Sequence, residues 1–479
     1  MAENLRQDTL NSVKWAAIEK FSLQGIQFVI SIILARLLTP GDFGVIGMLA
    51  IFISISQTFI DSGFTTALIR KIDRCEEDFS TSFIVNSAIS LVVVLVLFFA
   101  SPFIASFYGM PILEPILRVQ SVTLIVYALM AVQLTKLTIE LNFKAIAKCS
   151  LISSLSSGLI GILLAYSGLG VWALVIQNLS SVIINLICIV WHCRWYPKTG
   201  FSKQSFHDLF SFGKNILGAS LLTSIYSNID SLVIGKFFSP ESLGNYSRGT
   251  SIARLPVDNI NGVLNKVTYP IFAKIQNDTE RLISSYRKYI QITSMCIFFG
   301  CCLLAAIGKP FILMILTDKW TNAIIFLQIF SFAIIVDHIN AINLNLIKIK
   351  GRSDLILKLE IVKRIVSFCI LIAAIPFGVI GICVSKIIYS YMAVMINTYY
   401  NGKLFNMGLK VQFMDFVKYC IWSLIAALPA YALTFTHLPN IVQICLGVAV
   451  SVFIYYMALR KDAIFLEVKQ MILSKIQKK

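Results

Sequence analysis

Long apolar stretches alternate with short polar connections along the whole chain. The runs IQFVISIILARLL (26–38) and FIVNSAISLVVVLVLFFA (83–100) show the pattern. A helix needs about 20 mostly apolar residues to cross the hydrocarbon core of a bilayer. The pattern predicts fourteen membrane-spanning helices, at residues 11–36, 42–63, 79–101, 114–138, 146–166, 169–191, 207–236, 241–268, 284–307, 322–347, 355–376, 379–401, 413–435 and 439–459.

The composition agrees with this reading, because 57% of the 479 residues are hydrophobic, 14% are charged and the mean hydropathy is +0.80. An average soluble domain has far more charge. We therefore expect an all-α integral membrane protein. The start, MAENLRQDTLNSVKW, lacks the apolar core and cleavage site of a signal peptide, so the first span is expected to insert uncleaved.

Lys and Arg gather in alternate connections, which predicts the orientation in the membrane. Cytoplasmic loops accumulate these residues, and the connections SFYGMP, YSGLG, IPFG and FTHLPN contain none. Lys236, Lys309 and Lys319 are the main exceptions. Both termini are predicted to be cytoplasmic, and the basic amphipathic tail LRKDAIFLEVKQMILSKIQKK (459–479) would lie on an anionic inner leaflet.

The formal charge of +17 mostly reflects this topology, and scattered basic residues do not predict a nucleic-acid partner. Eleven cysteines and four histidines show no metal or redox spacing, so the cysteines are interpreted as small core residues in reduced surroundings. No metal and no cofactor is expected.

The segment ARLLTPGDFG (35–44) has a partner 200 residues later, GKFFSPESLG (235–244). Further on the offset is 208, and GLGVWAL (168–174) aligns with PFGVIGI (376–382). Chance is the alternative, since apolar segments align easily. The aligned pairs at the first offset are Lys14 with Lys214, Ser31 with Ser231, Arg36 with Lys236, Pro40 with Pro240, and Gly44 with Gly244.

A repeat of six spans keeps its orientation, so the two copies would be related by an axis along the membrane normal. This predicts an N-terminal six-helix lobe (1–205), a C-terminal six-helix lobe (206–405), and two extra helices with a basic tail (406–479). Two such lobes are a device for alternating access, in which one rocks against the other.

Four predicted spans carry polar residues at helical spacing, and we expect these polar faces to line one water-filled cleft. The alternative for each serine is a bond to its own backbone or a role in helix packing. The faces are Lys20, Gln24, Gln27 and Ser31; Gly47, Ile51, Ser54, Thr58, Asp61 and Thr65; Ser220, Ser224, Ser227 and Ser231; and Ser247, Ser251, Arg254, Asp258, Asn261 and Asn265.

Ionisable groups at membrane depth normally face a cavity or a partner, which makes them candidate site residues. Cations suggest an anionic cargo, since Arg binds phosphate through a planar fork. Candidate substrate-binding residues are Lys20, Gln24, Gln27, Arg248, Arg254, Asn261 and Arg364. Candidate ion-coupling residues are Asp61, Asp230, Asp258, Asp337 and His338.

Some of these candidate residues also have simpler, purely structural interpretations. Arg254 and Asp258 are spaced for an ion pair within one helix, and Asp337 with His338 could be a satisfied core pair. Asp230 could lie in the outer interface. Glu360, Lys363 and Arg364 are near a predicted cytoplasmic loop, so their side chains are expected to snorkel to the headgroups.

The sequence resembles the Wzx-type polysaccharide flippases, the polysaccharide transporter family within the MATE-like MOP exporter superfamily. The resemblance covers essentially the whole chain. It rests on LARLLTPGDFGVIGM (34–48), FIDSGFTTALIRK (59–71) and GKNILGASLLTSIYSNIDSLVIGKFFSPESLGNYSRG (213–249). The family has no catalytic motif, so the candidate residues above come from this sequence's own pattern.

The resemblance implies fourteen helices and a cargo of undecaprenyl-pyrophosphate-linked oligosaccharide, a lipopolysaccharide or exopolysaccharide repeat unit, moved across the bacterial inner membrane. The implied partners are this lipid-linked oligosaccharide, membrane lipids, and the polysaccharide polymerase and other assembly proteins. A proton or sodium gradient would reset the cycle.

Three other kinds of membrane protein are alternatives. A multidrug or small-molecule cation antiporter of the same fold would have a more acidic cavity, and a lipid II flippase would use the same chemistry. A membrane polymerase, ligase or glycosyltransferase would need a sizeable exposed loop, and every predicted outward connection is short. No Walker-type phosphate loop is present, so direct drive by ATP is not expected.

Overall fold

The computed structural model describes residues 20, 22–61 and 63–476, and residues 1–19, 21, 62 and 477–479 lie outside it. Part of the predicted first span and the side chain of Asn265 therefore lie outside the described residues. Contacts divide the chain into unit 1, Met1–Gly244, and unit 2, Asn245–Lys479. Each unit is described by itself.

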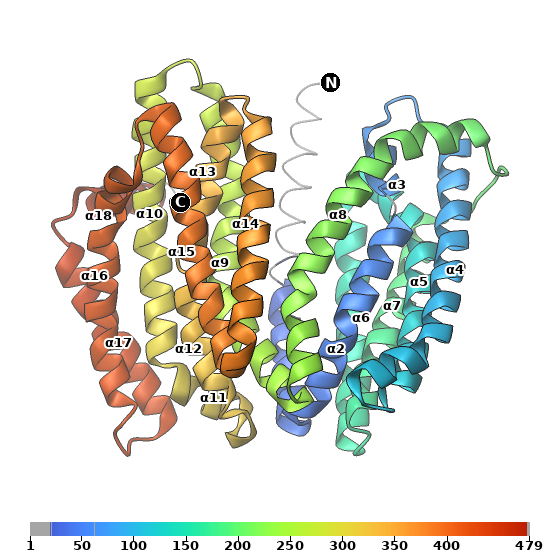
Figure 1. The fold of residues 1–479 in the computed structure, drawn as a ribbon, viewed down its shortest axis with the longest axis horizontal. Helices are drawn as coiled ribbons and strands as arrows, with labels where there is room; N and C mark the ends of the chain where they lie inside the picture. The colour runs from blue at the N-terminus through green and yellow to red at the C-terminus, as the bar shows by residue number, and fades with distance from the viewer. Residues whose placement is uncertain (1–19, 21, 62, 477–479) are drawn as a thin grey trace. The chain divides into compact units, whose positions relative to one another are not determined.

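The described chain is helical. Unit 1 contains a first helix, Ser22–Leu37, followed by α2 (Pro40–Asp61), α3 (Phe64–Arg70), α4 (Glu76–Tyr108), α5 (Leu113–Ile139), α6 (Phe143–Tyr166), α7 (Val171–Cys193) and α8 (Lys203–Phe237). Helix α9 (Pro240–Lys274) begins in unit 1 and continues into unit 2. Unit 2 then contains α10 (Thr279–Ala306), α11 (Gly308–Leu316), α12 (Ala323–Ile334), α13 (Asp337–Ile349), α14 (Ser353–Ala374), α15 (Gly378–Phe405), α16 (Leu409–Leu433), α17 (Asn440–Leu459) and α18 (Ala463–Ile476) (Figure 1).

The prediction of an all-helical, multi-pass membrane protein is confirmed. Among the described residues, eleven helical stretches are long and apolar enough to cross a membrane. One of the eleven stretches, Asp354–Phe405, contains both α14 and α15. The helix Ser22–Leu37 is apolar but shorter, and it is not counted among the eleven. Helix α9 is outside the set, since its polar face lowers its hydropathy. The number fourteen stays a prediction.

In unit 1, α4 packs on α5, α5 and α6 pack on α7, and α2 packs on α8 (Figure 1). One end of the unit has an aromatic core in which Phe64, Phe79 and Trp195 are buried. Phe64 begins α3, directly after Gly63, whose φ of 73° lets the chain turn sharply after α2.

The two copies of the motif that is repeated in the sequence pack against each other. A Cβ at Gly44 would lie 1.7 Å from the carbonyl oxygen of Pro240, and one at Gly244 would lie 1.8 Å from the carbonyl oxygen of Pro40. Each glycine therefore admits the other copy's proline carbonyl against its backbone. Both glycines are sites of close packing, and the two copies are in reciprocal contact.

The contacts place α8 in unit 1, whereas the predicted lobes divide the chain after residue 205. The reason is packing, because α8 lies against α2, α3 and α4. Gly63 and Gly213 bring backbones together here, since a Cβ at Gly63 would lie 2.5 Å from the carbonyl oxygen of Gly213. The assignment of six-helix lobes stays a prediction.

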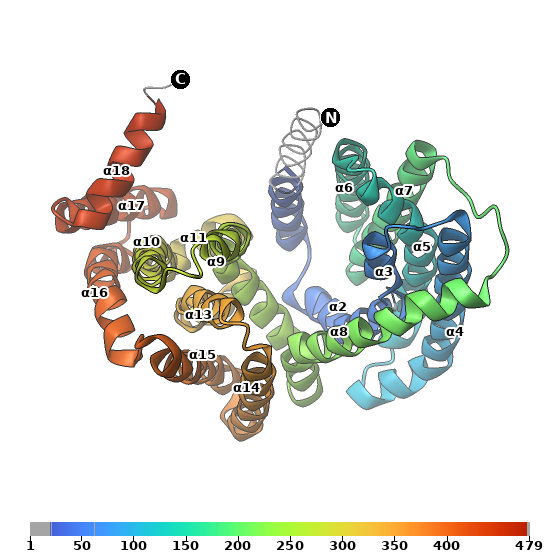
Figure 2. The same cartoon turned by 90° about the horizontal axis from the view of Figure 1, so that it is seen from above.

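In unit 2, α13 is surrounded by α10, α14 and α15 (Figure 2). A buried polar network holds it there. The amide oxygen of Asn343 accepts hydrogen bonds from the Tyr286 hydroxyl and, at 2.6 Å, from the Asn401 amide. The Asn343 amide donates to Gln412 at 3.1 Å. Four helices, α10, α13, α15 and α16, are joined in this way.

The predicted tenth span, 322–347, is not one continuous helix. Helix α12 ends at Ile334 and α13 begins at Asp337, so Ile335 and Val336 form a break. Hydropathy could not reveal this break, because Ile335 and Val336 are themselves buried and apolar. The break places Asp337 at the start of a helix, where a carboxylate is favoured by the helix dipole.

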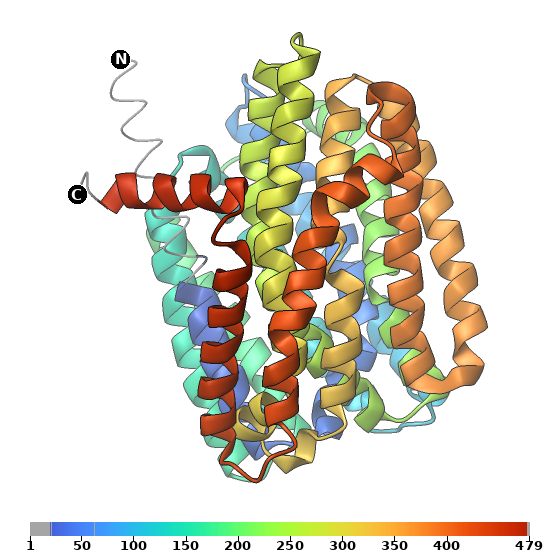
Figure 3. The ribbon, with the colours of Figure 1, turned by 90° about the vertical axis from the view of Figure 1, so that its left-hand side faces the viewer.

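The end of the chain is fastened to α10 and α16 by ion pairs. Lys288 of α10 pairs with Glu467 of α18, and Lys418 of α16 pairs with Asp462, which directly precedes α18. Figure 3 shows α18, the red C-terminal helix, turned across the direction of α17. The predicted amphipathic tail forms a helix whose apolar Phe465 and Val468 pack against the core of unit 2.

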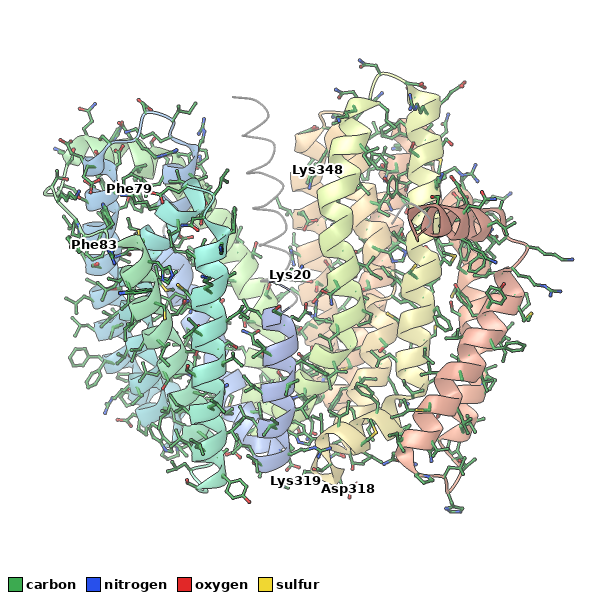
Figure 4. All side chains as sticks on the ribbon, turned by 180° about the vertical axis from the view of Figure 1, so that it is seen from behind. Lys20, Phe79, Phe83, Asp318, Lys319 and Lys348 are labelled. Carbon is green, nitrogen blue, oxygen red and sulfur yellow. The ribbon has the colours of Figure 1, made fainter. Side chains whose placement is uncertain are left out.

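Figure 4 shows Lys348 and Lys319 at opposite ends of unit 2. This agrees with the predicted topology, because the connection after Lys348 is basic, with Lys350 and Arg352, and Lys319 is one of the exceptions in the other connections. The side of the membrane on which each end lies stays a prediction.

We expect Gly44→Ala to destabilise the protein by about 1–3 kcal/mol, the usual cost of overpacking a tight contact. The added methyl group would displace the Pro240 carbonyl. Thermal unfolding of the purified protein in detergent would measure the change. In the matched control, Gly218→Ala in α8, nothing lies within 4 Å of the new Cβ, so helix propensity should stabilise it by up to about 1 kcal/mol. Equal effects of the two changes would contradict the reciprocal contact.

The link between α17 and α18 should depend on pH. Burial of the Asp462 carboxyl acts to raise its pKa, but hydrogen bonds from the Lys418 ammonium and the Phe465 backbone N–H outweigh it and hold the pKa below the usual 3.8. A carboxyl with a lowered pKa stabilises the fold above its unfolded pKa and loses this contribution as the pH falls through its folded value.

We therefore expect Asp462→Asn to lower stability by about 1 kcal/mol at pH 7 and the difference from the wild type to disappear as the pH falls below 3.8. Protease cleavage of α18 as a function of pH would measure this. Asp354→Asn is the control, because its partner Arg352 and Asp354 itself are both exposed and the pair should contribute little. A pH-independent difference would show that the charge is not responsible.

Candidate functional site

Unit 1 contains a pocket of about 490 Å³ between α2, α5 and α8, with Asp61 as its charged residue. Asp61 is the last residue of α2 and is exposed. Hydroxyl and amide groups surround it. The polar lining consists of Ser54, Gln57, Thr58, Asp61, Thr65, Tyr127, Thr135, Thr138 and Ser220.

This pocket joins two of the polar faces predicted from sequence. The hydroxyl of Thr58 in α2 lies 2.8 Å from the hydroxyl of Ser224 in α8. Ser224 is one helical turn from Ser220, which lines the pocket. The faces of the second and seventh predicted spans thus face each other within unit 1. A carboxylate amid hydroxyls can bind a cation, a proton or a hydroxylated ligand.

In unit 2 the break between α12 and α13 brings three ionisable residues together. Asp337 interacts electrostatically with Arg254 and Asp258, both of α9. The Arg254 guanidinium lies over the ring of Phe330 in α12, 5.1 Å from its centroid. The neighbours of Arg254 therefore extend beyond its own helix, and the simple reading of an isolated pair with Asp258 is insufficient.

The polar face of α9 stays accessible along most of its described length. Ser247, Ser251, Arg254 and Asp258 are exposed, and Asn261 is half-buried. An exposed face that carries a cation can bind a phosphate group without disrupting the packing of a core.

His338 faces a different neighbour from Asp337. Its side chain is fully buried, and its Nε2 lies 2.8 Å from the hydroxyl of Ser294 in α10. The ring packs edge-on to Phe298, with centroids 5.5 Å apart. The Nδ1 atom on the other side of the ring is buried without a hydrogen-bond partner among the described residues, so the interpretation as a satisfied core pair with Asp337 is incomplete. The role of His338 in ion coupling stays a prediction.

The remaining predicted site residues are dispersed. Lys20 is exposed at the described start of the first helix (Figure 4), Gln24 and Asp230 are half-buried, and Gln27 is exposed at a second pocket of unit 1. Arg248 lies over the buried Trp320 ring, 5.5 Å from its centroid, which ties it to the connection after α11.

The prediction that Glu360, Lys363 and Arg364 snorkel to the headgroups is wrong for Lys363. Lys363 is 4% exposed and its ammonium bonds Glu360. Arg364 also lies 3.5 Å from Glu360. A buried ammonium needs a paired carboxylate, and one helical turn supplies it here.

Sequence reasoning missed several pocket residues, namely Gln57, Tyr127, Thr135 and Thr138 in the Asp61 pocket, and Gln120, Ser154, Ser157, Gln177, Asn178 and Ser181 in the second pocket. Their spacing within each helix is a usable signal, since Thr135 and Thr138, or Gln177 and Ser181, lie one turn apart. Within the described part of the chain, no group of three or more His, Cys, Asp or Glu residues is arranged to hold a metal ion.

The fold is that of known membrane transporters. A solved structure of the lipid II flippase MurJ, in an inward-closed conformation, matches with a TM-score of 0.73 at 15% identity, over 93% of this chain and 98% of that one. An inward-facing multidrug resistance transporter of the MATE family and MOP superfamily matches with a TM-score of 0.62 at 14% identity, over 81% of this chain and 98% of that one. Identities this low show the fold alone.

The sequence comparison defines the family. The model of the polysaccharide biosynthesis protein family matches residues 33–325, more than half of the chain, and the chain belongs to this family. It is 25% identical over 363 residues to the teichuronic acid biosynthesis protein TuaB of Bacillus subtilis, covering 74% of this chain and 73% of TuaB. It is 28% identical over 316 residues to the succinoglycan biosynthesis transport protein ExoT of Rhizobium meliloti, covering 65% of this chain and 63% of ExoT.

A third relative is the lipopolysaccharide biosynthesis protein WzxC of Escherichia coli, 23% identical over 386 residues, with 79% of this chain and 78% of WzxC covered. This chain therefore belongs to the polysaccharide biosynthesis protein family, and it shares its fold with the solved lipid II flippase and MATE transporter structures. The resemblance stated from its motifs is confirmed.

The hydroxyl contact between α2 and α8 can be tested directly. Thr58→Val and Ser224→Ala each remove one partner, and a double-mutant cycle should give a coupling of about 1 kcal/mol in thermal unfolding. Thr223→Ala is a suitable control for the neighbouring position, because its hydroxyl bonds back to the carbonyl of Ala219 in its own helix. Thr58 and Thr223 should show no coupling. An additive Thr58 and Ser224 pair would mean that the two helices are not joined there.

Proposed function

We propose that this protein is a flippase that moves an undecaprenyl-pyrophosphate-linked oligosaccharide across the inner membrane of a bacterium. The proposed architecture has fourteen membrane-spanning helices, two six-helix lobes plus two, and works by alternating access. The observation that carries the proposal is the exposed polar face of α9, with Arg254 in its middle, in a chain of the polysaccharide biosynthesis family.

The chemistry of the cargo explains why such a face is needed. A pyrophosphate and its sugars cannot cross hydrocarbon cheaply, while the isoprenoid tail has no reason to leave it. A protein that offers a cation and hydroxyl groups to the head can lower this barrier and leave the tail in lipid. Arg254 supplies a forked donor for phosphate oxygens, and Ser247 and Ser251 supply hydroxyls on the same face.

Asp337 could couple the binding of a proton or another cation to the movement of the cargo. Its carboxylate interacts with Arg254, so an ionised Asp337 competes with the pyrophosphate for the guanidinium. Neutralisation of Asp337 by a proton, or of the cluster by a cation, would release Arg254 to the cargo. In this proposal, Asp337 and Asp258 are the principal coupling residues, and Asp61, Asp230 and His338 remain further candidates.

The implied setting follows from the same proposal. Both termini face the cytoplasm, as the distribution of Lys and Arg predicts. The cargo is delivered by enzymes that build the lipid-linked repeat unit on the inner leaflet and is consumed outside by a polymerase and other assembly proteins.

The Asp61 pocket favours a second candidate function, a small-molecule antiporter of the same fold. A single carboxylate among hydroxyls and aromatic Tyr127 suits an organic cation. Family membership favours the glycan cargo instead, because the relatives of this chain are named for polysaccharide pathways.

The proposed function predicts where substrate accumulates. In host cells that lack the protein, complete undecaprenyl-pyrophosphate-linked repeat units should accumulate on the cytoplasmic leaflet, and the wild-type gene should restore their export. Restoration with Arg254→Ala, at equal protein level, should leave flipping at least about tenfold slower, because one charged contact is worth about 1.4 kcal/mol or more.

Arg460→Ala is the matched control, since Arg460 is exposed at the end of α17 and belongs to neither candidate site. It should restore flipping fully. Normal lipid-linked sugars on both leaflets of the deleted strain would overturn the flippase proposal and favour the antiporter. Full activity of Arg254→Ala would remove Arg254 from the site and leave the flippase proposal standing.

A further inference from the structure

A second pocket of unit 1 is lined by polar and apolar residues, and none of the described residues that line it is charged. It has a volume of about 340 Å³ and lies among the first helix, α2, α5, α6 and α7. Its polar lining is formed by amides and hydroxyls only, namely Gln27, Ser31, Gln120, Ser154, Ser157, Gln177, Asn178 and Ser181. The rest of the lining is apolar, namely Ile30, Leu34, Phe43, Ile46 and Leu174.

The polar groups differ in depth. Gln27 and Asn178 are exposed, Gln177 is half-buried, and Gln120 is only 4% exposed. The hydrogen bond at Gln120 uses its backbone carbonyl, which accepts from the Thr123 hydroxyl at 2.6 Å. Its side-chain amide is therefore left for a group inside the pocket. A buried amide without a partner costs free energy, and this cost is greatest where the surroundings are hydrocarbon.

Glycines of α6 create the space. A Cβ at Gly161 would lie 2.9 Å from the side chain of Gln177, and one at Gly158 would lie 2.2 Å from the side chain of Ile30. Larger residues at these positions would push both side chains into the pocket. Gly161 thus leaves room for the side chain of Gln177 to lie against α6 at the pocket.

The lining selects the kind of ligand. Among the described residues that line this pocket, a cation would find no carboxylate and an anion would find no Lys or Arg. Amides and hydroxyls match groups that both donate and accept hydrogen bonds, while Leu34, Phe43 and Leu174 match an apolar ring face. A neutral sugar ring has both properties. The pocket volume, near the lower limit for ligand pockets, suits one such ring rather than a chain of them.

We propose that this pocket of unit 1 is a subsite for one uncharged sugar residue. The inference rests on the proposed function, since it identifies a place for part of the glycan that is separate from the cationic face of α9. Gln120 and Gln177 bind the hydroxyl groups of the ring at the base of the site, and Gln27 and Asn178 bind them at its mouth.

The test measures binding of uncharged methyl glycosides of glucose, galactose and N-acetylglucosamine to the purified full-length protein, by saturation-transfer NMR and competition. At least one glycoside should bind to the wild type. Gln120→Leu should weaken that binding about tenfold or more, because a buried hydrogen-bonding partner is lost. Gly161→Ala should also weaken it, because the new methyl group displaces Gln177.

Gln133→Leu is a matched control, since Gln133 is on the same helix, is equally buried at 4% exposed, and does not line the pocket. Its binding should stay within about twofold of the wild type. Asn178→Leu, at the exposed mouth, provides a variant that cannot fail by unfolding a core, and it should weaken binding as well.

Three results would overturn the proposal. These are no binding of any glycoside to the wild type, equal loss in Gln133→Leu and Gln120→Leu, or pocket variants that change only the binding of sodium or potassium ions. The flipping assay separates this inference from the proposed function. Normal flipping without glycoside binding removes the subsite alone, and glycoside binding without flipping removes the flippase function alone.

Discussion

The reciprocal contact between the two copies of the repeated motif is the constraint on which the organisation of unit 1 depends. Gly44 lies against the Pro240 carbonyl and Gly244 against the Pro40 carbonyl, at distances that no side chain could share. Proline begins the helix at each site, and glycine one turn later admits the other helix. Helices that start 200 residues apart in the sequence are therefore held backbone to backbone.

This contact determines which polar groups meet. With α2 and α8 running together from that point, Thr58 reaches Ser224 and the Asp61 pocket forms between them and α5. The N-terminal part of α2 helps to close the uncharged pocket, through Phe43 and Ile46, on the same helix face as Ser54 and Gln57 of the Asp61 pocket. One helix thus lines a neutral cavity near its start and an acidic one near its end, so a single unit offers two distinct chemistries to a cargo with more than one kind of group.

Unit 2 concentrates its charge where a helix is interrupted. Asp337, directly after the break, is within electrostatic range of Arg254 and Asp258 of α9, while the side chain of His338 contacts Ser294 and Phe298. Irregular backbone at membrane depth is tolerated where protein buries it, and Ile335 and Val336 are buried. Nearby, the amide network of Asn343 and the buried Lys363–Glu360 pair show how the same unit satisfies polar groups that serve packing.

Hydropathy and charge in the sequence were enough to determine the class of protein and the position of nearly every helix, because a bilayer demands long apolar stretches with satisfied backbones. The alignment of Pro40 and Gly44 with Pro240 and Gly244 also revealed the repeat, since turn chemistry is local. Helical spacing revealed the exposed face of α9 that contains Arg254.

Tertiary structure alone decided which faces meet and how deep each side chain lies. Ile335 and Val336 are as apolar as any helix interior, so the break between α12 and α13 had no local signal. Because Lys363 is close to a predicted loop in the sequence, its side chain is expected to reach the membrane interface. Packing within the protein buries it instead. Gln120 and Gln177 are far apart in the chain and ordinary by themselves, and they form one pocket only because five helices pack around glycines that leave room between them.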